Sequence, residues 1–494
     1  MKKNIIPIGS ILAGLLISHA VAFLQVYISN ERLYARLHMI ESAGYLPAPN
    51  RFIMSTLQDF GSAFFGGLFF TLTVGAALIL LSLGLIWIWG NIFKKNRIFF
   101  IPVLILWAGT LLYVNLRGFC PIESAYFILV PITVIITSRS WRSSCPNSGA
   151  LLNSALVLIP FILLIVVWST VLNGNLFINI RDYLLLNNPV GIKINDFYYR
   201  YTLYPAEVIK PLRKKTLKTC SISNILNKSE LHTLESSLLN RDYLILDAGR
   251  GELNIEGQGH LIIFKIRGRE VIRGLKKDFI LNPDFILNQL SDRTDKHMFF
   301  RSFIYFSIFS GFPLLLYLLI LAGLQYVLHF IKQPKIVLIS ASCISLFAGI
   351  ALFLPVYTGV SFLSKNANIA DAIQSGKWQD NLWALKIVCE KRLDIMDYQG
   401  WQDLSASPHI SVRYWFARAL GVSRRQNSCH VLVSLLDDHH PNVVCQALTA
   451  IKLRGCRSAA DIILSKMKKS NHWYIQTYAY SALRGLGWKQ TKYQ

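Results

Sequence analysis

The sequence lacks CxxC motifs. None of its eight cysteines stands in a CxxC arrangement, which excludes zinc-ribbon and thioredoxin-type sites. Cys429, His430, His439, His440 and Cys445 lie near one another, but their spacing matches no standard set of metal ligands. Histidines in surface turns are the commoner explanation. We therefore expect no metal site and no cofactor.

Asp, Glu, Lys and Arg are missing from the long apolar runs. Proton- and ion-coupled transporters place such groups along their route, so the absence of Asp, Glu, Lys and Arg disfavours a coupled transporter. Acidic residues are scarce in the whole chain, with 27 Asp and Glu against 51 Lys and Arg and a net charge of +24. A basic chain can bind nucleic acid, but membrane proteins collect Lys and Arg in short cytoplasmic loops. Because 53% of the 494 residues are hydrophobic and the mean hydropathy is +0.40, we expect a membrane protein with no nucleic-acid partner.

Several apolar runs are long enough to cross the roughly 30 Å of a bilayer core. We predict seven spans, at approximately residues 5–28, 62–92, 98–116, 125–137, 151–172, 303–331 and 336–362. The fourth is short and contains Pro131, which predicts a kink or a partly re-entrant segment. The first is longer than the core of a signal peptide, so we favour an uncleaved anchor over a cleaved leader. Ser10, Gly14, Ser18 and Ala22 share one face of it, and this stripe of small residues favours close packing against another helix.

Basic residues between the spans indicate the orientation in the membrane. They occur at residues 94–97, 138–142 and 332–335, and the positive-inside rule places these three loops in the cytoplasm together with the N-terminus. Residues 29–60, which include an amphipathic piece around Leu33, Leu37 and Ile40, then form an extracytoplasmic polar loop. Residues 117–124, 173–301 and the whole C-terminal part also fall outside. We expect a protein of the bacterial inner membrane with extracytoplasmic repeats.

The segment 173–301 mixes helical and strand patterns and predicts a small α+β domain. Helices are predicted at 180–187 and 229–239, and strands at 196–204, 242–246 and 260–266. The aromatic run in the first strand is a candidate platform for a sugar or a lipid headgroup, although alternation in a half-buried strand also explains it; its members are Tyr198, Tyr199, Tyr201 and Tyr204. Single residues suited to acid–base catalysis are scattered through the domain, at Asp182, Asp196, His232, Asp247 and His260.

The C-terminal part repeats one short pattern four times. Ala384, Phe416, Ala447 and Ala479 occupy equivalent positions, separated by 32, 31 and 32 residues. Self-similarity at this period predicts a helical solenoid, because a single helix pair cannot bury its apolar face alone.

Within this pattern, Leu420-Gly421 predicts a helix end at a glycine with positive φ, and a second helix is expected to close near Gly455. Asp438 is a candidate N-cap and Pro441 suits a first turn. Together with Val412-Arg413, these residues resemble the short HEAT-like repeats of the phycobilisome-lyase type. The resemblance covers about a quarter of the chain and implies a protein-binding scaffold without chemistry of its own.

The sequence therefore predicts a multi-pass α-helical membrane protein of about seven transmembrane helices, with an extracytoplasmic α+β domain and an α-solenoid of HEAT-like repeats. The parts are a bundle at 1–172, the α+β domain at 173–301, a transmembrane hairpin at 302–362, a linker at 363–379 and the repeats at 380–494. The leading function is a scaffold or accessory protein that is anchored in the bilayer and binds a protein partner through its repeats. The alternatives are a membrane transferase acting on a lipid-linked substrate, with residues 173–301 catalytic, and a transport or export component. The candidate partner contacts are Trp415, Arg418, Trp473 and Arg484, and packing between repeats is the competing interpretation of both tryptophans.

Overall fold

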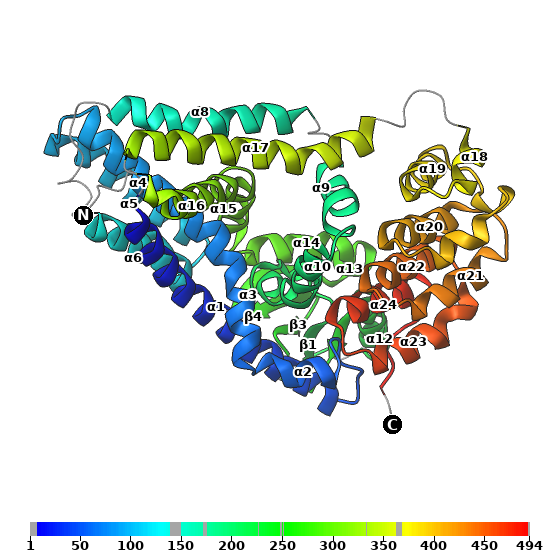
Figure 1. Cartoon of the computed structure of the whole chain (residues 1–494). Helices are drawn as coiled ribbons and strands as arrows, with labels where there is room; N and C mark the ends of the chain where they lie inside the picture. The colour runs from blue at the N-terminus through cyan, green and yellow to red at the C-terminus, as the bar shows by residue number, and fades with distance from the viewer. Residues whose placement is uncertain are drawn as a thin grey trace.

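The computed structural model describes residues 7–138, 150–170, 175–225, 227–247, 249, 251–331, 333–361 and 368–492. These residues are mostly helical and include a five-stranded sheet. Figure 1 shows a bundle of long helices, a solenoid of short helices at the end of the molecule away from the N-terminus, and the sheet between them. The predicted basic residues Arg139, Arg142 and Lys332 lie outside the described part of the chain.

Within the described residues, four helical segments are long and apolar enough to cross a membrane. They are α1 (Ile8–Ser42), the continuous run of α3 (Phe60–Phe70), η1 (Thr71–Gly75) and α4 (Ala76–Asn91), the segment Arg97–Asn115 containing α5 (Phe100–Asn115), and α17 (Pro334–Ser361). A fifth is formed by α15 (Met298–Phe309) and α16 (Gly311–Val327) if the two are counted as one span, since they meet at a bend of 43°. The apolar helices α6 (Pro121–Thr137) and α8 (Ala150–Ser169) are shorter or only partly described.

The predicted stripe of small residues on α1 is buried against α4 and η1. Ser10, Gly14, Ser18 and Ala22 are all buried. A Cβ on Gly14 would lie 2.7 Å from Cγ1 of Ile79, closer than side-chain atoms approach one another. Small residues therefore set the distance between these helices, as the four-residue spacing predicted.

The first helix continues far beyond its apolar run, so the predicted polar loop at 29–60 is wrong for its first part. α1 extends to Ser42, and Leu33, Leu37 and Ile40 are buried. This part of α1 contacts α11 (Leu203–Ile209), so the amphipathic piece packs on protein. α2 (Arg51–Leu57) follows, with Asn50 as its N-cap.

The α+β domain is built on a mixed sheet of order β2-β1-β3-β4-β5. Its strands are β1 (Lys218–Ser223), β2 (Tyr243–Ile245), β3 (Leu253–Gln258), β4 (Leu261–Ile266) and β5 (Arg269–Leu275). β1 pairs in parallel with β2 and β3, whereas the other pairs are antiparallel. α12 (Lys228–Leu239), α13 (Lys276–Leu281) and α14 (Pro283–Thr294) share a core with the sheet through Leu238, Phe264, Phe279 and Leu290. Both strand patterns at 242–246 and 260–266 match strands of this sheet.

The predicted strand at 196–204 is wrong, because these residues belong to α10 (Pro189–Tyr201) and α11. Asn188 caps α10 by accepting a hydrogen bond from the backbone N–H of Gly191, and Pro189 occupies the first turn. Its aromatic residues pack against two separate helical elements, which favours a helix despite their strand propensity.

The solenoid consists of two layers of short helices. The layer nearer to α9 (Leu176–Ile180) and α10 in Figure 1 contains α19 (Trp378–Lys391), α20 (Ile410–Val422), α22 (Pro441–Arg454) and α24 (Trp473–Gly485). The outer layer contains α21 (Ser428–Ser434) and α23 (Ala460–Lys469), and α18 (Ile369–Gln374) precedes the stack within the predicted linker. The four aligned residues Ala384, Phe416, Ala447 and Ala479 each lie in an inner helix and are 0% exposed.

Two details of the repeats differ from the sequence prediction and two agree with it. Gly421 lies inside α20, where a Cβ would come within 2.9 Å of Ala450 Cβ, so close helix packing and not helix termination requires glycine there. Asp438 is not the N-cap of α22, because His440 takes that place. Pro441 does occupy the first turn, and Gly455 ends the helix with φ +70°.

Candidate functional site

The inner face of the solenoid is bound to the chain's own segment 176–209, which leads from the bundle into the α+β domain. Its central contact is Asp182, which lies in η3 (Arg181–Leu185) and is 0% exposed. The indole N–H of Trp415 donates to Oδ2 of Asp182 at 2.7 Å, and Lys386 Nζ lies 3.0 Å from the same oxygen. Arg181 donates to Oδ1 at 2.6 Å. Donors from two solenoid helices and from its own segment therefore satisfy this buried carboxylate.

Aromatic rings surround the two cations at Asp182. The Arg181 guanidinium lies 3.8 Å from the ring centre of Tyr414, and Lys386 Nζ lies 4.6 Å from that of Tyr183. Burial lowers the pKa of Lys386 despite the opposing charge of Asp182. For Arg181, burial is outweighed by Asp182 and Tyr414, and the net effect raises its pKa. Lys386 thus keeps its carboxylate partner only while the solenoid and the segment stay together, whereas Arg181 and Asp182 are neighbours in the same segment.

Neutral polar contacts extend this interface along the later repeats. The side chains of Asn195 and Asn442 form a buried amide pair at 3.1 Å. The loop after α1 joins at the last repeat, where the backbone N–H of Asn50 donates to Gln476 Oε1 at 2.7 Å and its side chain reaches the carbonyls at the end of α23. Three segments that are distant in sequence therefore form one packed unit.

The four residues predicted to contact a partner all have contacts within the chain. Trp415 and Trp473 are each 7% exposed. Trp415 bonds to Asp182, and Trp473 packs edge-on against Tyr204. Arg418 lies over the ring of Trp415, and Arg484 pairs with Asp242 at 2.7 Å and donates to the carbonyl of Asn240. Trp415, Trp473 and Arg484 therefore join the solenoid to other parts of the molecule, whereas Arg418 contacts Trp415 within the same helix.

The four tyrosines predicted as a ligand platform do not form one surface. The Tyr199 ring lies 4.7 Å from that of Tyr474 in the last repeat, in a tilted arrangement, and Tyr204 is buried and hydrogen-bonded to Thr56. Tyr201 faces Phe65 of the bundle, whereas Tyr198 is largely exposed. Because the run is helical, its members point in different directions, and burial raises the pKa of Tyr199.

Histidine recurs at one position of the repeat, a feature that the sequence reasoning missed. His409, His440 and His472 are the N-cap residues of α20, α22 and α24. Each stands seven residues before an aligned anchor, so the repeat alignment itself carried the signal. His440 lies 3.4 Å from Asp196, and His472 lies beside Tyr199 of α10. Burial lowers the pKa of all three, that of His472 to about 4.

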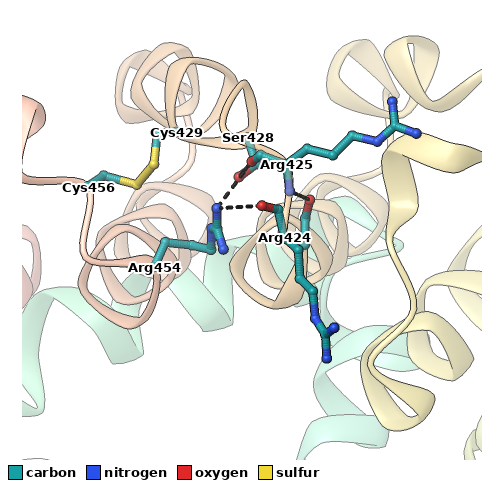
Figure 2. The surroundings of a disulfide bond; sticks show 7 residues. Arg424, Arg425, Ser428, Cys429, Arg454 and Cys456 are labelled. Atoms are coloured by element: carbon teal, nitrogen blue, oxygen red, sulfur yellow. Dashed lines mark hydrogen bonds between the residues drawn. A yellow bond between two sulfur atoms is a disulfide. The ribbon is translucent and has the colours of Figure 1, made fainter.

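The edge of the solenoid at the C-terminal ends of α19, α20 and α22 is exposed and basic. We call this the basic edge and define it by five exposed residues at or just after these helix ends, Lys391, Arg392, Arg424, Arg425 and Arg457. The turns are adjacent, since Asp394 accepts from the backbone N–H of Arg424 at 3.0 Å and Arg454 donates to the carbonyls of Arg424 and Arg425. Figure 2 shows the Arg424 and Arg425 side chains pointing away from the turn while Arg454 lies beneath it.

A disulfide lies beside the basic edge. Cys429, at the start of α21, is bonded to Cys456, two residues after the end of α22, and their Cα atoms are 5.8 Å apart (Figure 2). The bond ties the second repeat to the third. Cys429 is also one of the two cysteines that were considered as metal ligands together with His439 and His440.

The residues considered for acid–base catalysis are dispersed. Asp182 is bonded in the inner face, whereas Asp196, His232 and His260 are exposed at separate places. Within the described ranges, no group of three or more His, Cys, Asp or Glu is arranged to hold a metal. A different acidic residue is buried: Glu123, expected in the loop 117–124, lies in the first turn of α6, 2.8 Å from His297 and 3.2 Å from Gln25.

Comparison with known proteins supports the repeats alone. A family model described as HEAT repeats matches residues 400–484. No curated protein and no solved structure matches the chain. The C-terminal part of the chain is therefore a HEAT-like repeat domain, the class that the sequence pattern indicated.

Proposed function

We propose that the chain is a scaffold of the bacterial inner membrane, with seven crossings, a cytoplasmic N-terminus and short HEAT-like repeats of the phycobilisome-lyase type outside. In this arrangement the repeats are fixed to the bundle by their inner face and bind a protein partner along the basic edge. The observation that carries the proposal is the occupied inner face: Asp182 and its partners hold the solenoid in place while the basic edge stays exposed.

Contacts between distant segments support an odd number of crossings, as the proposed seven provide. Residues after the first, fifth and seventh predicted spans touch one another through Asn50 with Gln476 and through Asp182 with Lys386. Residues after the third span touch those after the fifth, through Arg117 and the carbonyl of Asp292. All of these segments follow an odd number of crossings, so one side of a membrane accommodates every contact. This parity requires α6 and α8 to be counted together, either both as spans, which gives the seven crossings, or neither, which gives five.

The disulfide supports an extracytoplasmic solenoid. Disulfides persist in oxidising compartments such as the bacterial periplasm and are rare in the cytosol. Cys429 and Cys456 therefore suit the side that positive-inside counting assigns to the repeats.

HEAT solenoids bind partners through extended surfaces, and here the inner surface is taken by the chain itself. The basic edge offers cations from three consecutive repeats. Asp394 is occupied by hydrogen bonds from Ser423 and Arg424, and Asp397 is paired with Arg425. The surface thus suits an acidic segment of a partner protein.

The test is charge reversal at the basic edge. We expect Lys391→Glu with Arg424→Glu to abolish recovery of the proteins that co-purify with the full chain in mild detergent. The matched control is Lys469→Glu with Lys489→Glu, which makes the same charge change at exposed solenoid positions outside the edge. Equal recovery with both double variants, or no reproducible co-purifying protein with the unmodified chain, contradicts the proposal.

A further inference from the structure

A groove of about 620 Å³ lies between α14 and the connection from α5 to α6. It is lined by Arg117, Phe285, Asn288, Gln289, Asp292 and Arg293. The groove has no part in the scaffold function proposed above or in the functions predicted from the sequence. Its lining combines two guanidinium groups, two side-chain amides and an aromatic ring.

The position of α5 places this groove at the surface of the bilayer. α5 is almost entirely apolar, and Ile101, Leu104, Ile105 and Leu106 are largely exposed, so lipid is the environment that covers them. Arg117 follows two residues after the helix ends at Asn115. An arginine directly beyond an apolar span stands at headgroup level. Arg117 also donates to the carbonyl of Asp292 at 3.2 Å, which fixes α14 at the same level.

Apolar side chains continue from the groove toward the hydrocarbon. Leu116 and Phe119 are 71% and 76% exposed, and Phe285 on α14 is 61% exposed. Large apolar side chains exposed together beside polar ones mark a membrane or ligand contact. The surface beside the groove therefore changes from apolar to cationic over a short stretch of chain. Such a surface can contact both the apolar and the charged part of an amphiphilic ligand.

The groove carries an excess of positive charge. Its single lining acid, Asp292, lies 3.6 Å from a third arginine, Arg213. Arg293 donates one N–H to the carbonyl of Val271 at 3.1 Å. A guanidinium has five N–H donors, so Arg117 and Arg293 retain donors for an added group.

We propose that this groove binds the headgroup of an anionic glycerophospholipid in the outer leaflet of the membrane. The phosphodiester accepts hydrogen bonds from Arg117 and Arg293, since the planar guanidinium matches the geometry of phosphate oxygens. Asn288 and Gln289 contact the polar end of the headgroup, and the acyl chains follow Leu116 and Phe119 along α5. This inference rests on the membrane placement proposed above and is independent of the solenoid's partner.

The experiment compares lipid retention in two double variants. The full chain is purified in mild detergent, mixed with phosphatidylglycerol or phosphatidylcholine, and examined by native mass spectrometry. We expect retained phosphatidylglycerol, with binding weakened about tenfold or more in Arg117→Gln with Arg293→Gln, as loss of charge-assisted hydrogen bonds implies. Lys228→Gln with Arg269→Gln removes the same charge from exposed positions of the α+β domain and should bind like the unmodified chain.

Two results overturn the inference. One is equal retention of both lipids by the unmodified chain, and the other is equal loss of phosphatidylglycerol in the groove and control variants. Thermal unfolding measured on each variant identifies a protein that has lost its fold, and Arg117→Lys with Arg293→Lys then serves as the second variant, expected to retain more lipid than the glutamine pair. A chain absent from the membrane fraction contradicts the proposed function. A membrane-bound chain that retains no anionic lipid contradicts this inference alone.

Discussion

At the residue scale, Asp182 is the side chain on which the position of the solenoid depends. Asp182→Ala removes the acceptor shared by Trp415, Lys386 and Arg181 and leaves buried cations uncompensated. We expect the free energy of unfolding to fall by about 3–5 kcal/mol, the usual cost of breaking a buried ion pair. The measurement is thermal or urea unfolding in detergent. Tryptophan fluorescence is the signal, because Trp415 is a direct hydrogen-bond partner of Asp182.

Asp196→Ala is the matched control for that change. Asp196 lies in the same segment and is about half exposed, with His440 at 3.4 Å. Its removal should change the unfolding free energy by less than about 0.5 kcal/mol. Adding Lys386→Met to Asp182→Ala should recover part of the lost stability, since the second change removes an unpaired buried charge. Equal effects of the two aspartate variants would show that Asp182 does not hold the interface.

His472 predicts a dependence of stability on pH. Burial first, and then the charge of Arg200, lower its pKa to about 4 from the usual 6.5, with Asp196 opposing and His440 adding to the shift. The folded protein then binds fewer protons than the unfolded chain between these values. Stability is therefore complete above about pH 6.5 and is lost as the pH falls toward 4, by at most about 1.4 kcal/mol per pH unit for one histidine.

His472→Gln should flatten this dependence, whereas His232→Gln should leave it unchanged, because His232 is exposed on α12. Unfolding midpoints at pH 7.5 and pH 5.0 supply the comparison. The prediction fails if the unmodified protein and His472→Gln lose the same stability over this interval. His409 and His440 contribute in the same direction, so the slope should be reduced and not abolished.

At the element scale, periodic sequence patterns predicted helix positions and close helix packing, but they did not predict contacts between distant segments. The repeat alignment located every inner helix, since the anchors recur where each helix packs on the next. The small-residue stripe on α1 predicted close packing for the same reason. The aromatic run at 196–204 failed, because strand propensity of tyrosine reflects packing surroundings, and here α10 packs on a solenoid helix and on the bundle.

The interface at Asp182 could not be predicted from the sequence. Asp182 and Lys386 are separated by 204 residues, and a single acid in a mixed segment gives no local signal of its partners. The histidine N-caps could have been predicted from the sequence, because each lies at a fixed distance from an aligned anchor residue. The long-range contacts could not have been predicted, since the order of helices along the chain does not determine which of their faces pack together.

At the scale of the whole molecule, the contacts between distant segments can be used to test the proposed membrane topology, because segments in contact must lie on the same side of the membrane. The contacts of Asn50, Asp182 and Arg117 with distant segments all join residues that follow odd-numbered spans of the proposed topology. Removing one crossing, such as α6, would place Arg117 and Asp292 on opposite sides of the membrane while their contact requires one side. An odd number of crossings, as in the proposed seven, therefore stands or falls together with the packed unit formed by the solenoid, segment 176–209 and the loop after α1.

We expect alkaline phosphatase fused after residue 494 to be active, since this enzyme folds only after export, and a fusion within residues 94–97 to be inactive. Thiol trapping in intact cells should find Cys429 and Cys456 oxidised, because the same placement exposes them to the periplasm. Cys429→Ser is the control, in which the trapping reagent should react with Cys456. An active fusion at 94–97 together with reduced Cys429 and Cys456 would invert the orientation, and the basic edge would then face a cytoplasmic partner.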